Sequence, residues 1–95
     1  MPILLGHAGS GDVEGYAKVA RNCPHVFLET CFSRSPYGVV EYFVREVGVD
    51  RIVWGSDATW MDIGQQIGKI LFADISDADK ETILVHNPRR ILAES

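Results

Sequence analysis

The chain has 95 residues, of which 46% are hydrophobic and 23% charged, and its formal net charge is -4. This length corresponds to one domain or part of one, and the composition is that of a globular chain. The acidic balance argues against a nucleic-acid or anionic-membrane partner, because both require a basic surface. The sequence has no apolar run near the ~20 residues of a membrane span and no recognisable targeting segment, which predicts a cytoplasmic location.

The two cysteines, Cys23 and Cys31, show neither a Cys-x-x-Cys spacing nor a disulfide framework. We therefore expect thiols in a reducing cytoplasm. The sequence has no low-complexity segment and no linker, so residues 1–95 are interpreted as a single domain.

The first third of the chain alternates apolar runs with an amphipathic segment. Residues 2–7 form an apolar run without alternation, which predicts a strand buried on both faces. A helix is expected after Asp12, a good N-cap residue, and should end at residues 22–24, where a proline follows. Residues 25–30 predict a second strand, because valine, phenylalanine and threonine suit a pleated surface.

The remainder of the chain repeats this alternation. Ser35 and Pro36 predict the start of a helix that ends at Gly48, a natural C-terminal stop. Residues 51–54 predict the third strand. Further helices are expected with Ile63, Ile67, Ile70 and Leu71 on one apolar face, after the cap residue Ser76, and from Asn87-Pro88 onward.

The predicted order is β-α-β-α-β-α-α, which defines an α/β fold class. Strands that alternate with helices form a parallel sheet with right-handed crossovers. Each βα unit has roughly 25 residues, about one eighth of the ~250 residues of a typical TIM barrel. The expected fold is therefore a parallel three-stranded βαβαβα(α) unit.

Polar residues stand at the end of each predicted strand: His7, Glu29 with Thr30, and Asp57. Because the carboxyl ends of parallel strands share one edge of a sheet, we expect these residues on a common rim. Imidazole and carboxylate groups can bind a divalent metal or transfer a proton. Structural roles are the alternative: His7 could hydrogen-bond the following loop, and Asp57 could cap it.

Other polar or aromatic residues favour structural roles. Glu29 is expected to form a salt bridge, and His25 opens its strand at the opposite rim. His86 precedes a helix junction, where capping or exposure is expected, and Trp54 is expected in the core. Residues 9–11 could hold an anion on backbone N–H groups, but they do not form a complete phosphate-binding motif.

Four segments together carry a family resemblance: ILLGHAG at residues 3–9, LET at 28–30, DRIVWGSD at 50–57 and NPRRIL at 87–92. In this order they resemble the C-terminal part of the amidohydrolase-related proteins. These are metal-dependent hydrolases and decarboxylases, a group that includes aminocarboxymuconate semialdehyde decarboxylase. The resemblance implies a TIM-like (β/α)₈ barrel, of which this chain corresponds to the last three eighths, strands six to eight.

The resemblance also implies roles for two residues. His7 matches the sixth-strand histidine, which is an acid/base near the metal in the decarboxylase branch and a metal ligand in others. Asp57 matches the eighth-strand aspartate, a metal ligand that takes a proton from the activated water. The implied cofactor is a divalent metal, with zinc as the expected ion, which lowers the pKa of bound water. The implied substrate is a small molecule.

The family's first-strand His-x-His pair and fifth-strand histidine have no counterpart in these residues. A catalytic zinc needs three protein ligands and an open position, whereas this chain offers Asp57 and, at most, His7. We therefore expect the chain alone to be inactive, although activity in a complete barrel remains open. Three strands cannot close a barrel, so the outer strands and the inward faces of Leu5, Leu28 or Val53 should lack neighbours. This predicts homo-oligomerisation or pairing with a complementing barrel portion.

Three hypotheses follow for function. The first is the C-terminal part of a metal-dependent hydrolase or decarboxylase. The second is a non-catalytic assembly or binding domain derived from that fold, which should bind no metal and tolerate Asp57→Asn. The third is a small signalling domain with Asp57 as phospho-acceptor, which would need acidic Mg²⁺ ligands at the first strand end that residues 7–9 do not provide.

Overall fold

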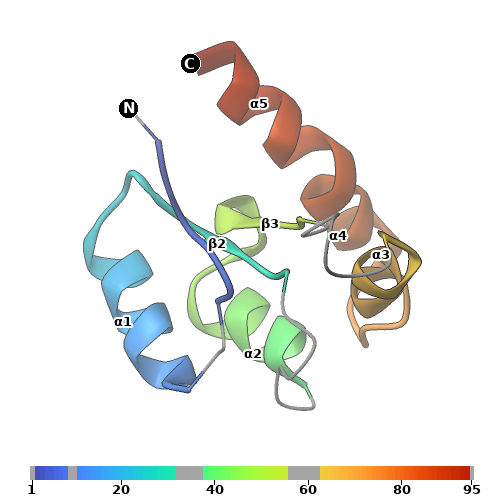
Figure 1. The fold of residues 1–95 in the computed structure, drawn as a ribbon, viewed down its shortest axis with the longest axis horizontal. Coiled ribbons are helices and arrows are strands. Elements are labelled where there is room, and N and C mark those ends of the chain that lie inside the picture. The colour runs from blue at the N-terminus through green and yellow to red at the C-terminus, as the bar shows by residue number, and fades with distance from the viewer. Residues whose placement is uncertain (1, 9–10, 32–37, 56–62, 95) are drawn as a thin grey trace.

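The computed structural model describes residues 2–8, 11–31, 38–55 and 63–94. Three of the predicted features, Asp57, the glycine-rich residues 9–10 and the Ser35-Pro36 helix start, lie outside these ranges. The described strands form one parallel sheet in the order β1-β2-β3 (Figure 1), which confirms the α/β fold class. The strands are β1 (Ile3–Leu5), β2 (Val26–Glu29) and β3 (Ile52–Val53).

Helical segments follow each strand, as the alternating pattern predicts. They are α1 (Val13–Asn22), α2 (Val39–Glu46), the short 3₁₀ helix η1 (Val49–Arg51), α3 (Ile63–Leu71), α4 (Asp77–Glu81), the π-helical segment η2 (Thr82–His86) and α5 (Asn87–Glu94). None of the described helices has both the length and the apolar character needed to cross a membrane.

Strand β1 is more exposed than its sequence suggests. Among the described strands it pairs with β2 alone, with Ile3 opposite Val26 and Leu4 opposite Phe27. Ile3 is 53% exposed and Leu4 is 48% exposed, so the prediction of a strand buried on both faces is wrong. The physical reason is its place at the edge of the described sheet, where no further strand covers it.

The two faces of the sheet are covered by different helices. Successive side chains of a strand point to opposite faces. Leu28 and Ile52 belong to the main core beneath α1 and α2, whereas Phe27 and Val53 pack with Ile91 of α5. Figure 1 shows α1 and α2 on one side of the sheet and α5 across β3 on the other. The expectation that Leu28 and Val53 lack an opposing layer is therefore wrong, because the helices cover both.

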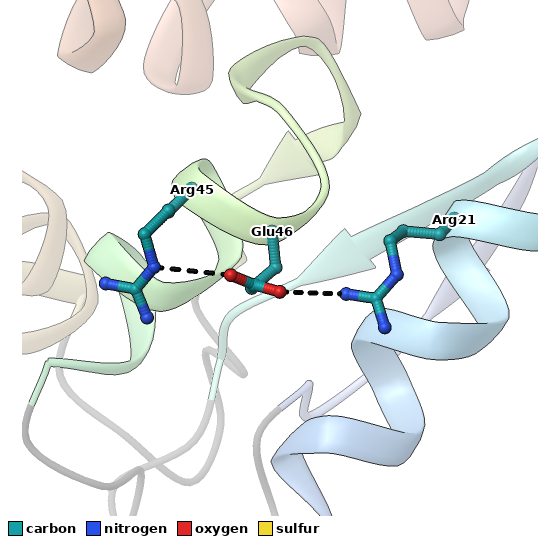
Figure 2. A network of polar contacts seen from close by, with 3 residues as sticks. All are labelled: Arg21, Arg45 and Glu46. Atoms are coloured by element: carbon teal, nitrogen blue, oxygen red, sulfur yellow. Dashed lines mark hydrogen bonds and ion pairs between the residues drawn. The ribbon is translucent and has the colours of Figure 1, made fainter.

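Helices α1 and α2 begin and end as local sequence dictates. The side chain of Asp12 accepts a hydrogen bond from the N–H of Gly15 at 2.9 Å, which caps α1. Beyond α2, Gly48 has a φ of 108° and donates to the carbonyl of Val44 at 3.1 Å. At the surface, Glu46 of α2 links Arg21 of α1, 3.2 Å away, with its neighbour Arg45 (Figure 2).

Helix α3 has the predicted extent but a rotated buried face. Ile70 is fully buried as expected, whereas Leu71 is 46% exposed. The amide side chain of Gln66 is buried instead. A methyl group at Gly68 would meet its nearest neighbour, Phe72, only at 3.9 Å, so this glycine does not mark a close backbone approach.

The C-terminal helices form one continuous helical stretch, where the sequence suggests a new start at Asn87-Pro88. Pro88 has no N–H to donate to the carbonyl of Leu84, and the turn before it widens into the π-helical η2. The indole N–H of Trp54 donates to that carbonyl at 3.1 Å. This hydrogen bond links the end of β3 to the turn. The Trp54 side chain is half-buried and also packs against the core.

Candidate functional site at the carboxyl ends of the strands

His7 lies in the turn that follows β1, at the carboxyl-end rim of the sheet. Its side chain is exposed, and its φ of 56° is the one positive value for a non-glycine residue in the described part of the chain. Few L-residues adopt this left-handed conformation without support. The support is a hydrogen bond from the His7 N–H to Oε1 of Glu29, at 3.1 Å.

The carboxylate of Glu29 occupies the centre of the rim. Its Oε1 atom also accepts a hydrogen bond from the thiol of Cys31 at 2.9 Å. A Cβ atom at Gly6 would lie 3.7 Å from Oε1, and one at Gly55 would overlap the carboxylate, with Cδ only 2.7 Å away. The side chain thus spans from the end of β1 to the end of β3. Where the sequence suggested a salt bridge, the described hydrogen-bond donors are a peptide N–H and a thiol.

Lys69 brings a positive charge from α3 to the same rim. Its Nζ donates to the carbonyl of Thr30 at 2.6 Å. Burial lowers the pKa of Lys69 from its ordinary value, while the electrostatic interaction with Cys31 and Glu29 acts in the opposite direction. The Thr30 hydroxyl is buried and donates to the carbonyl of Val53 at 3.3 Å, so Thr30 serves the sheet rather than the rim.

The structure brings together two of the residues that the sequence placed on the rim, His7 and Glu29. Asp57 lies outside the described residues. His25 is exposed at the opposite end of β2, as expected, and its carbonyl accepts the N–H of Ile3. His86 is exposed as well, with Nε2 3.4 Å from a carboxylate oxygen of Glu81.

Two rim residues were missed by sequence reasoning. The sequence by itself identifies Cys31 only as a thiol in a reducing compartment, and the structure places neither cysteine in a disulfide. Its spacing of two residues from Glu29 puts both side chains on the same face of an extended chain, which was a usable signal. Lys69 had a weaker signal, as the single charged residue within α3.

The described part of the rim supplies an imidazole and a carboxylate, but not a complete metal site. Among the described residues, no three histidine, cysteine, aspartate or glutamate side chains converge as potential ligands. Oε1 of Glu29 already accepts two hydrogen bonds. A catalytic zinc needs three ligands, so these residues by themselves do not fit a metal.

The parallel sheet with its helices defines an α/β protein. In parallel α/β barrels the catalytic groups lie at the carboxyl ends of the strands, where this chain also carries polar side chains. The sequence model of the amidohydrolase family matches residues 1–93, and the chain therefore belongs to the amidohydrolase family. No curated protein and no solved structure gave a significant match. The family membership argues against the signalling-domain hypothesis.

Proposed function

We propose that this chain is the C-terminal part of a metal-dependent hydrolase or decarboxylase, to which it supplies His7 as acid/base and Asp57 as metal ligand. The family match along residues 1–93 supports this assignment. The observation that carries it is the placement of His7, exposed at the carboxyl-end rim on a turn held by Glu29. In barrels of parallel strands, this rim is where catalytic groups lie.

The chemistry of this proposal divides between the chain and a cofactor. An imidazole can take or give a proton near neutral pH, and His7 is exposed. A divalent ion, zinc first, would supply a bound water of lowered pKa. Because two ligands hold zinc poorly, the chain alone is expected to be inactive on its small-molecule substrate.

The same incompleteness supports a proposal of self-association. The edge strand β1 exposes Ile3 and Leu4, and a groove of about 200 Å³ lies between the strands and α5. Edge strands present unpaired backbone groups that pair readily with another strand. We propose that a second copy of the chain covers this edge. The groove is lined by Leu4, Val53, Trp54, Pro88, Ile91 and Leu92.

Zinc titration of the purified chain tests the catalytic assignment. We expect weak zinc binding that is lost in both His7→Gln and Asp57→Asn and is retained in the control His25→Gln, since His25 lies at the opposite end of the sheet. Zinc affinity in both rim variants equal to that of the unaltered chain would overturn the assignment.

The second candidate is a non-catalytic assembly domain, which the exposed β1 edge favours. Light scattering of the chain with and without chelator separates the two. An assembly domain predicts a stable oligomer that is indifferent to chelator and to Asp57→Asn. A dispersed monomer under all conditions would contradict self-association.

A further inference from the structure

We propose that Glu29 is the positioning residue for His7, because it holds the turn after β1 through both its side chain and its main chain. The inference rests on the proposed function, in which His7 transfers a proton. It assigns Glu29 a role that acts through His7 rather than on a substrate.

Two successive peptide groups of the turn are bound by this one residue. The N–H of His7 donates to Oε1 of Glu29 at 3.1 Å, and the N–H of Ala8 donates to the carbonyl of Glu29 at 2.8 Å. Ala8 is fully buried, which anchors the second of these points. These two hydrogen bonds hold the N–H groups on either side of the His7 Cα. They therefore fix the backbone of His7 and the direction in which its side chain leaves the backbone.

The conformation of His7 explains why such a clamp is needed. At a φ of 56° the residue is in the left-handed region, where a Cβ is crowded by its own backbone. A strained backbone conformation of this kind persists only when contacts with the surrounding structure hold it in place. A hydrogen bond from a peptide N–H to a carboxylate is stronger than one between neutral groups, so Glu29 can hold His7 in this conformation.

The carboxylate is in turn held by its neighbours. The thiol of Cys31 donates to the same oxygen at 2.9 Å, and the charge of Lys69 lies close enough to interact with Glu29. On the far side, the absence of a side chain at Gly55 makes the space that the carboxylate fills. Gly55 is therefore part of the same device: a methyl group there would displace Glu29 and release His7.

Nuclear magnetic resonance of the chain tests the proposal without an activity assay. The imidazole ¹³Cε1–¹Hε1 signals of His25 and His86 serve as internal references, because both side chains are exposed and His25 lies at the end of β2 opposite to Glu29. In Glu29→Ala we expect the His7 signal to move while the references stay. Amide exchange at His7 should accelerate about tenfold, the size expected for loss of one hydrogen bond. An unchanged His7 signal and unchanged exchange would overturn the proposal.

Further variants keep the test informative if Glu29→Ala fails to fold. Gly55→Ala should reproduce the movement of the His7 signal, whereas Gly68→Ala, which adds the same methyl group without a clash, should not. In a His7→Gly background, where the left-handed turn carries no strain, Gly55→Ala should shift the urea midpoint less than in the unaltered chain. An equal shift in both backgrounds would contradict the coupling.

The outcome also separates this proposal from the proposed function. If the His7 signal moves in these variants but zinc binding does not depend on His7, the positioning role stands and the metal-site assignment fails. If zinc binding depends on His7 while its signal ignores Glu29 and Gly55, the reverse holds.

Discussion

The amino end and the carboxyl end of the sheet are closed by different kinds of side chain. At the amino end, the guanidinium of Arg51 donates to the carbonyls of Ala20 and Val26, each at 2.8 Å, and also to that of Cys23. Asn87 is fully buried and donates to the carbonyls of Val49 at 2.8 Å and Ile52 at 2.7 Å. These donors satisfy carbonyls that would otherwise lie unpaired between elements.

At the carboxyl end, the side chains are titratable, and they are either exposed to solvent or in contact with one another. His7 is exposed in a strained turn, Glu29 accepts from a peptide and a thiol, and burial lowers the pKa of Lys69. One end of this small sheet is held together by side-chain hydrogen bonds to backbone carbonyls, whereas the other end carries ionisable side chains. Variants at the amino end should therefore change stability without affecting His7, whereas those at the carboxyl end should also change the environment of His7.

The largest loss of stability is expected for Asn87→Ala. The change leaves two carbonyls without their donor, one of them in the core, and should lower the free energy of unfolding by about 3 kcal/mol. Urea denaturation measures it. Asn22→Ala, at the exposed end of α1, is the matched control and should stay within about 0.5 kcal/mol of the unaltered chain. Equal effects for the two would erase the distinction between the ends of the sheet.

Arg51→Lys is expected to cost less, about 2 kcal/mol. A lysine ammonium keeps the charge but cannot reproduce the planar fork that reaches three carbonyls at once. Arg89→Lys, on the exposed side of α5, provides the control and should change little. Thermal or urea unfolding checks both, and the His7 resonance should be unaffected in either variant. A shifted His7 signal in Arg51→Lys would mean that the two ends are coupled.

A pH dependence is expected from Lys69. Since burial lowers its pKa in the folded chain below the ordinary 10.5, the unfolded chain holds the proton more tightly. The cost of burying the ammonium is therefore complete below the lowered pKa and disappears as pH rises toward 10.5. Relative to Lys69→Met, the unaltered chain should gain stability across that window.

Urea unfolding at a series of pH values measures this difference. Lys18→Met, exposed on α1, should show none. A gain on lowering the pH, in place of a gain on raising it, would show that the attraction of Cys31 and Glu29 outweighs burial.

The smallest effect is expected for Glu46→Gln, which breaks the link between α1 and α2 shown in Figure 2. The side chain of Glu46 is 36% exposed and that of Arg21 is 39% exposed, so water screens the pair. We expect a change of less than about 0.5 kcal/mol that vanishes near about 1 M salt. A larger loss of stability that does not depend on salt would show that this surface ion pair, and not only the amino end of the sheet, stabilises the fold.

Local sequence signals predicted most of the fold. The cap at Asp12, the stop at Gly48 and the cap at Ser76, which accepts from the N–H of Asp79 at 3.1 Å, all act within a few residues. The buried face of α2, with Val39, Val40 and Phe43, follows the same logic, because a helix brings residues three and four apart onto one face. These features depend only on near neighbours in the chain.

The errors arose where a residue's environment is set by distant segments. The apolar run of β1 has the same sequence whether or not another strand lies beside it, so its exposure could not be predicted. Leu71 is exposed where an apolar face was predicted, and Gln66 is buried, because the rotation of α3 is decided by the elements against which it packs. The carbonyl of Leu84, which Pro88 cannot pair, accepts a hydrogen bond from the indole of Trp54, 30 residues away.

For the candidate site, the sequence by itself determined that His7 stands at a strand end and, through its motifs, that the chain is an amidohydrolase relative. Only the tertiary structure decided that Glu29 faces the rim, that it clamps the turn of His7 from 22 residues away, and that Gly55 leaves it room. The physical reason is register. Which residue of β2 lies beside the end of β1 follows from the pairing of Leu5 with Leu28, a relation between strands that no local pattern contains.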